Sequence, residues 1–139
     1  NGGKQRAHNY GVELCESELF ICLDSDDYFA KGAVEEILKK WNSVKHNDKI
    51  SGIVALKGNP DRTPIGTFFP DGLKRTTLMD LYRKYKFKGD TALIYRTDIL
   101  KRFPFYVVEG EKFMGEGYVY SQIDQEYKLS VLPSVLYLC

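Results

Sequence analysis

Apolar residues along this chain follow two patterns, continuous runs and regularly spaced positions. Continuous runs of strand length occupy residues 18–23, 50–56, 91–95 and 129–138, the last interrupted by Pro133. Apolar positions three and four residues apart predict helices over 7–15, from Lys31 to Trp41, after N-caps at Thr76 or Thr77 and at Thr97, and over 116–127. Residues 57–72 hold three prolines and three glycines and predict an irregular loop. This alternation is typical of an α/β fold, here with a mixed, largely parallel sheet flanked by helices.

The composition fits one globular domain and narrows the class of function. With 139 residues, 43% hydrophobic and 28% charged, the chain can bury a core without disulfides. Its formal net charge of +1 gives no basic field for nucleic acid, so no nucleic-acid partner is expected. No apolar run approaches the roughly 20 residues that span a bilayer. The three cysteines have no zinc-like spacing and are expected to be buried, reduced thiols of a cytosolic protein.

An acidic cluster directly follows the first apolar run. Asp24, Asp26 and Asp27 lie within four residues, with no lysine or arginine within three positions on either side. Because side chains alternate along a strand, Asp24 and Asp26 are expected to point the same way. Ligands of open α/β sheets bind at the carboxyl ends of strands. Adjacent carboxylates repel one another, so the cluster predicts a Mg²⁺ or Mn²⁺ site that phosphates complete.

Other interpretations of the cluster compete with this one. It could be a solvated turn in which Asp26 or Asp27 caps the next helix, within a non-catalytic binding module. It could be the Asp-x-Asp of a phosphatase, with Asp24 as nucleophile and Asp26 as acid, although the usual hydroxyl residue does not follow. An EF-hand loop from Asp24 to Glu35 is disfavoured because Phe29 takes the place of its required glycine.

Several segments, in order along the chain, resemble the family 2 glycosyltransferases of the GT-A fold. Residues 1–11 are similar to a helix motif that carries Lys4, Ala7, Asn9 and Gly11, and residues 18–28 to the strand and Asp-x-Asp motif that follow it. Residues 88–100, 103–105 and 110–116 are similar to one bacterial branch of that family. The resemblance implies an inverting enzyme that moves a sugar from a nucleotide-diphosphate sugar to a saccharide or lipid-linked acceptor.

The resemblance also implies a donor site. Lys4, Asn9, Asp24 and Asp26 would meet the donor's diphosphate, and Asp24, Asp26 and Asp27 would hold a Mg²⁺ or Mn²⁺ ion. A cation on the diphosphate neutralises the charge that develops on the leaving group.

Inverting members of this family use an acidic residue at the start of a late helix as general base for the acceptor hydroxyl. Glu116 occupies that place here, although Gly117 stands where the usual aspartate would be. Asp90 and Glu111 are the alternative bases.

The resemblance finally implies that residues 1–139 form a partial catalytic domain, which lacks the first nucleotide-binding strand and helix. Such a domain leaves a sheet edge and apolar surface uncovered, so self-association into a homo-oligomer is expected. The family's usual products are cell-surface polysaccharides. We therefore expect a cytoplasmic enzyme of polysaccharide biosynthesis, with peripheral contact at the inner face of the membrane.

Overall fold

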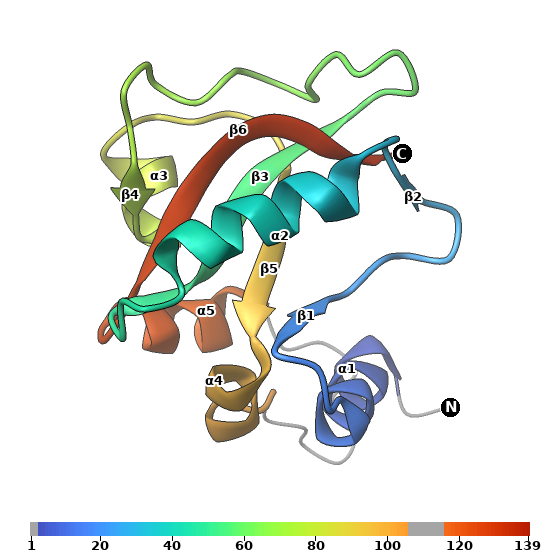
Figure 1. The fold of residues 1–139 in the computed structure, drawn as a ribbon, viewed down its shortest axis with the longest axis vertical. Coiled ribbons are helices and arrows are strands. Elements are labelled where there is room, and N and C mark those ends of the chain that lie inside the picture. Colours follow the sequence, from blue (N-terminus) through green and yellow to red (C-terminus); the bar gives the residue numbers. More distant parts are fainter. Residues whose placement is uncertain (1–2, 106–115) are drawn as a thin grey trace.

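A mixed sheet organises the part of the chain that the computed structural model describes, residues 3–105 and 116–139 without the side chains of 116 and 117. Its six strands lie in the order β1-β5-β3-β6-β2, and β4 pairs with β6 (Figure 1). The strands are β1 (Leu19–Ile21), β2 (Tyr28–Phe29), β3 (Ile50–Gly58), β4 (Arg75–Thr76), β5 (Thr91–Arg96) and β6 (Lys128–Leu138). The helices are α1 (Gly3–Leu14), α2 (Ala33–Val44), α3 (Leu78–Arg83), α4 (Thr97–Arg102) and α5 (Glu116–Asp124). None of these described helices has the length and apolar character needed to cross a membrane.

Each helix and strand predicted from the apolar pattern is present, with shifted ends. The Thr77 side chain caps α3 by accepting a hydrogen bond from the Asp80 backbone N–H at 3.0 Å, as predicted. Helix α5 ends at Asp124, three residues before the expected end at 127. Strands β2 and β4 were not predicted because two residues are too few to show a period.

The expectation of a largely parallel sheet is wrong, although the sheet is mixed and flanked by helices as predicted. In the described sheet only β3 and β6 pair in parallel, and the other four pairings are antiparallel. Residues 59–74 carry the chain from the end of β3 back to the edge where β3 begins, because β4 pairs with Leu129 and Ser130 at that edge. Helix α3 and the residues after it then return the chain to the end of β3, where Thr91 pairs with Leu56. Strand β5 therefore starts where β3 ends and runs back beside it.

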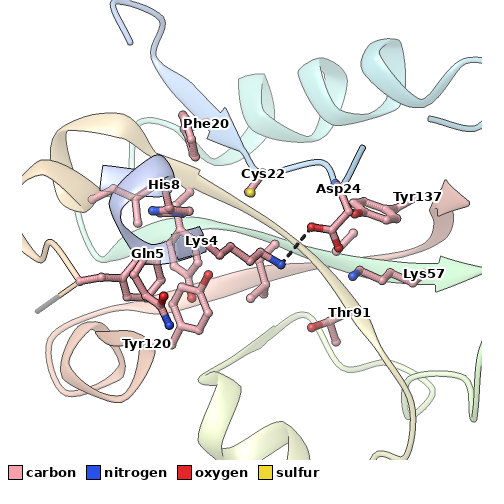
Figure 2. Close-up of a pocket in the computed structure, with 15 residues that line it drawn as sticks. Lys4, Gln5, His8, Phe20, Cys22, Asp24, Lys57, Thr91, Tyr120 and Tyr137 are labelled. Carbon is pink, nitrogen blue, oxygen red and sulfur yellow. Dashed lines mark hydrogen bonds and ion pairs between the residues drawn. The ribbon is translucent and has the colours of Figure 1, made fainter. Parts of the chain in front are cut away.

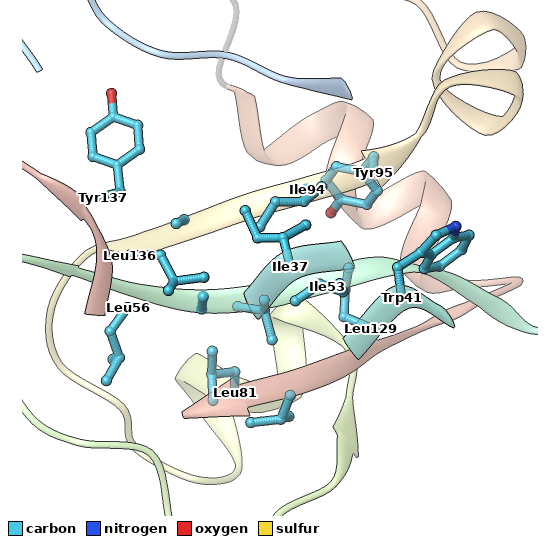
Figure 3. Close-up of a cluster of buried hydrophobic side chains, with 14 of the residues drawn as sticks. Ile37, Trp41, Ile53, Leu56, Leu81, Ile94, Tyr95, Leu129, Leu136 and Tyr137 are labelled. Carbon is cyan, nitrogen blue, oxygen red and sulfur yellow. The ribbon is translucent and has the colours of Figure 1, made fainter. Parts of the chain in front are cut away.

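The core lies on both faces of β3. Eight of its nine residues are buried, which is the pattern of a central strand covered on both sides. Ile37 and Trp41 of α2 reach into this core (Figure 3), and the Trp41 Nε1–H donates to Glu18 Oε1 at 2.9 Å. On β5, the Tyr95 ring stacks on Tyr120 of α5, which fixes α5 against the sheet.

Strand β6 continues through Pro133, which the sequence presented as an interruption. A register shift against β3 occurs between Val131 and Val135, so a bulge accommodates the proline. On its other side, β6 pairs with β4 up to Ser130 and with β2 from Tyr137 onward. Pro133 lies between these two pairings, where its missing N–H removes no ladder hydrogen bond.

The expectation of buried cysteines is wrong for all three, although they are reduced as expected. None of the three forms a disulfide, but Cys22 and Cys139 are exposed and Cys15 is half-buried. Cys22 follows the last residue of β1 and Cys139 follows the last residue of β6. Both therefore lie at the edge of the sheet, outside its covered faces.

Candidate functional site

Four segments distant in sequence meet at one edge of the sheet. Strands β1 and β3 both run antiparallel to β5, and β3 runs parallel to β6, so β1, β3 and β6 end at the same edge. Asp24 follows β1, and Lys57 and Tyr137 are the second-to-last residues of β3 and β6 (Figure 2). Thr91 begins β5 at the same edge. Carboxyl ends of strands are where α/β sheets bind ligands.

Tyr137 holds the acidic turn in place. Its hydroxyl accepts a hydrogen bond from the Asp24 backbone N–H at 2.9 Å and donates one to Asp27 Oδ2 at 2.8 Å. The Asp27 N–H donates to the Asp24 carbonyl at 3.0 Å and closes the turn. Burial raises the pKa of Tyr137, and its bond to Asp27 raises it further, so the phenol stays protonated and keeps donating. The shape of the turn thus depends on a side chain more than a hundred residues away.

Two lysines supply the positive charge that the sequence near the cluster lacks. Lys4 Nζ at the start of α1 lies 2.9 Å from Asp24 Oδ1, as the dashed line in Figure 2 marks. This contact lowers the pKa of Asp24, and the charge of Lys57 lowers it further. Lys57 Nζ itself lies 4.3 Å from the centre of the Tyr137 ring, a cation–π contact. Both ammonium groups therefore lie beside the Asp24 carboxylate.

A small cavity extends from this charged edge along β5. Its volume is about 90 Å³, below the roughly 300–1,000 Å³ of sites that enclose a whole small molecule, so it fits part of a ligand. The charged end is formed by Lys4, Asp24 and Lys57, and the other end is largely aromatic. The residues of that second end include His8, Phe20, Tyr95, Phe105 and Tyr120.

The acidic pair of the Asp-x-Asp motif does not lie on a strand. Strand β1 ends at Ile21, and Asp24 to Asp27 form a turn, so the expected alternation of strand side chains does not apply there. The competing expectation that Asp26 or Asp27 caps the next helix is also wrong. Strand β2 follows the turn, and the N-cap of α2 is Gly32.

The predicted donor and metal residues divide into two groups. Asp24 and Lys4 line the cavity, and the exposed Asp26 and half-buried Asp27 belong to the same turn. Asn9 lies elsewhere: its side-chain amide donates to the Phe105 carbonyl at 2.7 Å and accepts from the Phe105 N–H at 2.8 Å. Asn9 therefore joins α1 to the segment after α4 and is not among the described residues that line this cavity.

The candidate bases lie in different parts of the molecule. Asp90 is exposed and directly precedes Thr91, a cavity residue, and its carbonyl accepts from the Lys57 N–H at 3.3 Å. Glu116 is the first residue of α5, one turn before Tyr120, and its side chain lies outside the described residues. Glu111 also lies outside the described residues.

The charges of the edge are close enough to act on one another. Burial raises the pKa of the Cys139 thiol, and the negative charges of Asp27, Asp90 and Asp26 add to this effect while Lys57 opposes it. A single thiol thus experiences the field of both acidic segments. Asp90, predicted as an alternative base, is therefore part of the same electrostatic environment as the turn.

The carboxylate oxygens of the acidic turn suit a hard cation such as Mg²⁺, which the phosphates of a substrate would also bind. Within residues 3–105 and 116–139, no three His, Cys, Asp or Glu side chains are grouped so as to hold a metal ion by themselves. Mg²⁺ is commonly bound by one or two carboxylates together with phosphates and water, all oxygen donors. Asp24 and its neighbour Asp26 provide carboxylates of this kind, so the residues present fit a cation that a diphosphate completes.

Lys57 and Tyr137 were missed by the sequence analysis. Lys57 is the first charged residue after the apolar run of β3, and that position at a strand's carboxyl end was a usable signal. Tyr137 lies inside the last apolar run, where nothing distinguishes it from a core residue. Only the strand order brings it to Asp24.

Comparison with known proteins gives the family and the fold of this chain. The model of the family described as "Glycosyl transferase family 2" matches residues 1–103. The crystal structure of residues 1–349 of TarS from S. aureus aligns with a TM-score of 0.69 and 21% identity, over 99% of this chain and 40% of that one. The same protein in complex with UDP-GlcNAc aligns with a TM-score of 0.65 and 22% identity, over 99% and 39%. No curated protein sequence matches.

These matches bear on fold and family. The TarS structures confirm a GT-A-like mixed α/β fold, and this chain spans about two fifths of their length. The family matched over residues 1–103 is the one that the sequence motifs resemble, rather than a family of phosphatases.

We predict that Tyr137→Phe lowers the free energy of unfolding by about 1–3 kcal/mol, because the partly buried Asp24 N–H and the Asp27 carboxylate lose their partner. Denaturant unfolding at neutral pH measures this. Tyr28→Phe is the matched control, since Tyr28 is exposed on the neighbouring β2 and its change is expected to stay within about 0.5 kcal/mol. Equal losses in the two variants would contradict the role of Tyr137.

The ion pair of Lys4 and Asp24 predicts a pH-dependent contribution to stability. Because the pKa of Asp24 is lowered in the fold, the pair stabilises above the ordinary pKa of 3.8 and the effect is lost as pH falls through the lowered value. Lys4→Met should reduce the free energy of unfolding at pH 7 by less than about 1 kcal/mol, as both side chains are substantially exposed.

The difference in the free energy of unfolding between wild type and Lys4→Met should disappear at a pH well below the ordinary pKa of Asp24. Arg6→Met, on the same helix, serves as the control and should show no such pH dependence. Denaturant unfolding at both pH values gives the comparison. A difference in the free energy of unfolding that stays constant across the pH range would contradict the ion pair of Lys4 and Asp24.

Proposed function

The chain belongs to glycosyl transferase family 2, and from this premise we propose that its charged cavity binds the diphosphate of a nucleotide-diphosphate sugar. The enzyme transfers that sugar to a saccharide or lipid-linked acceptor with inversion at the transferred carbon. The observation that carries the proposal is the convergence of Lys4, Asp24 and Lys57 on one cavity at the carboxyl edge of the sheet.

The two lysines suit a leaving diphosphate. An ammonium group is a compact positive charge that binds phosphate oxygens, and Lys4 and Lys57 approach the cavity from α1 and β3. In the structure Lys4 pairs with Asp24. Asp24 would have a cation as its partner in place of Lys4, whose ammonium group could then bind a phosphate oxygen.

Asp24 and Asp26 are the residues that would hold a Mg²⁺ or Mn²⁺ ion, with Asp27 as a further carboxylate in the turn. A cation bound there with the diphosphate supplies charge neutralisation to the leaving group. Tyr137 contributes by keeping the turn in one conformation, since its hydroxyl is bonded to both ends. A site held in this way needs little reorganisation when the ligand binds.

The general base is proposed to be Glu116, which begins α5 one turn before the cavity residue Tyr120. It would accept the proton of the acceptor hydroxyl as that oxygen attacks the sugar. Asp90, at the charged edge beside Thr91, is the alternative base.

The TarS complex supports a nucleotide-sugar donor, because that protein is described with UDP-GlcNAc bound. The donor sugar of this chain is not specified by that likeness, and UDP is a suitable first probe. A cytoplasmic location, contact with the membrane surface and self-association stay predictions from the sequence.

The first test measures UDP binding by titration calorimetry with Mn²⁺ or with EDTA. Binding is expected only with Mn²⁺, and Asp24→Asn should weaken it by about tenfold or more, as losing a partner of a metal site does. Asp48→Asn is the matched control, because Asp48 is an exposed aspartate away from the cavity. UDP binding that EDTA leaves unchanged, or equal affinities in the two variants, would count against the proposal.

A second test separates the base from the donor site. In a preparation that catalyses transfer, Glu116→Gln should lower the rate about a hundredfold or more, because proton transfer is lost. Its Mn²⁺-dependent affinity for UDP should be unchanged. Asp90→Asn serves as the comparison, and near-normal turnover by Glu116→Gln would rule out Glu116 as the base.

A further inference from the structure

The end of α3 and the segment after it concentrate positive charge on the surface. Four exposed basic residues lie within six positions, with no acidic residue among them: Arg83, Lys84, Lys86 and Lys88. Within the part of the chain that the structure describes, no ion pair joins any of the four to a carboxylate, although Asp80 and Asp90 are near in sequence. The formal net charge of the whole chain is only +1, so this positive field is local and faces outward.

Lys86 keeps its charge at a backbone position that is unfavourable for lysine. Its φ is 56°, in the left-handed region that glycine and asparagine adopt more readily. The Phe87 N–H donates to the Leu81 carbonyl at 3.1 Å and closes the chain against α3 in this conformation. The fold requires the turn, but nothing in its packing requires a basic side chain there, since Lys86 is exposed.

An exposed aromatic ring lies beside these charges. Phe68 is 69% exposed, more than any other large hydrophobic side chain of the described residues. The Thr67 N–H donates to the Lys88 carbonyl at 2.6 Å, so the segments that contain them run side by side. The next residue, Phe69, is buried against Phe87, with ring centroids 5.1 Å apart. Phe69 therefore serves the core, whereas Phe68 faces outward beside the basic segment.

The basic segment adjoins the edge of the sheet that carries the charged cavity. It leads from α3 directly into Thr91, the cavity residue that begins β5 (Figure 1). The Tyr82 hydroxyl donates to the Gly89 carbonyl at 3.2 Å and ties α3 to this segment, while the Tyr82 ring stays partly exposed. Lys88 and Thr91 are three residues apart, which is at most about 11 Å of chain.

We propose that these side chains form a basic aromatic surface that binds an anionic lipid bilayer. Its members are exposed and belong to α3 or to the two segments beside it: Phe68, Tyr82, Arg83, Lys84, Lys86 and Lys88. Basic side chains are attracted to anionic lipid headgroups, and aromatic rings are favoured at headgroup level. A soluble acidic polymer would meet the charges but would offer nothing apolar to the outward ring of Phe68.

Binding to the bilayer stands on these observations and goes beyond the proposed function. One consequence does rest on that function. Because the basic aromatic surface leads into Thr91, docking would bring the diphosphate edge of the sheet close to the lipid headgroups. A lipid-linked acceptor would be presented there.

Vesicle sedimentation tests the charged part of the surface. It compares vesicles of phosphatidylcholine alone with vesicles in which about a third of the lipid is phosphatidylglycerol. Wild type is expected to bind the anionic vesicles at least about tenfold more strongly, and about 1 M salt should remove the difference by screening. Lys86→Asn/Lys88→Gln should lower the partition coefficient on anionic vesicles about thirtyfold, which is about fivefold for each lysine. Asparagine suits the left-handed backbone at position 86, so this variant keeps the turn.

The matched control is Lys39→Gln/Lys45→Gln, which removes the same charge from α2 and its C-terminal end. Both of these lysines are exposed and lie outside the basic aromatic surface. Since attraction to a charged bilayer falls off within about a Debye length, this control should change the partition coefficient by less than about twofold.

Phe68→Trp tests for lipid rather than for charge. Trp41 is the only tryptophan of the chain and is buried in the core, so a change in emission reports on position 68. With anionic vesicles, the emission of Phe68→Trp is expected to shift to shorter wavelength as the new indole enters the headgroup region. Soluble polyphosphate should give no such shift.

Equal binding of wild type to both kinds of vesicle, equal losses in the two double variants, or an unshifted emission of Phe68→Trp at saturating anionic lipid would overturn the membrane surface. Binding to polyphosphate without binding to anionic vesicles would also overturn it and assign the charges to a soluble acidic polymer. The Mn²⁺-dependent affinity for UDP should be unchanged in Lys86→Asn/Lys88→Gln. Failure of the membrane surface and failure of the diphosphate site are therefore seen in separate measurements.

Discussion

The parallel pairing of β3 with β6 determines which side chains can meet in this molecule. It places the end of β6 beside the end of β3, and the antiparallel strand β5 brings the end of β1 to the same edge. Tyr137 can reach the turn after β1 only because of this order, and its hydroxyl then bonds both Asp24 and Asp27. The position of the acidic turn is thus a consequence of strand order, and the core around β3 maintains that order.

At this edge, acidic and basic side chains that are far apart in the sequence lie close together in the fold. The acidic turn has no nearby basic residue along the chain, yet Lys4 and Lys57 approach it in the fold. Mutual repulsion of the carboxylates is thereby reduced, and the same lysines line a cavity that an anionic diphosphate could enter. A site with both signs of charge is suited to a metal ion and a phosphate together, which is the chemistry that membership in glycosyl transferase family 2 supports.

The sequence contained most of the local structure and little of the long-range geometry. Periodicity located the helices and long strands, and Thr77 was found as a cap because its hydrogen bond is local. Strand direction was misjudged because it depends on the path between β3 and β5, which first returns to the start of β3 at β4. Asn9 was placed at the donor site although its amide pairs with Phe105. Tyr137 was invisible as a site residue, since a tyrosine in an apolar run has the same pattern whether its hydroxyl lies in the core or at a site.

The central claim is that the carboxyl edge of the sheet, where four separate segments meet beside Lys4 of α1, is a diphosphate site. Amide hydrogen exchange, followed by mass spectrometry with and without UDP and Mn²⁺, tests it most directly. The account predicts slower exchange in peptides that cover residues 22–28, 56–59, 89–92 and 135–139 together. Slower exchange confined to the opposite edge of the sheet, around residues 47–50 and 125–128, or no change in any peptide, would contradict it.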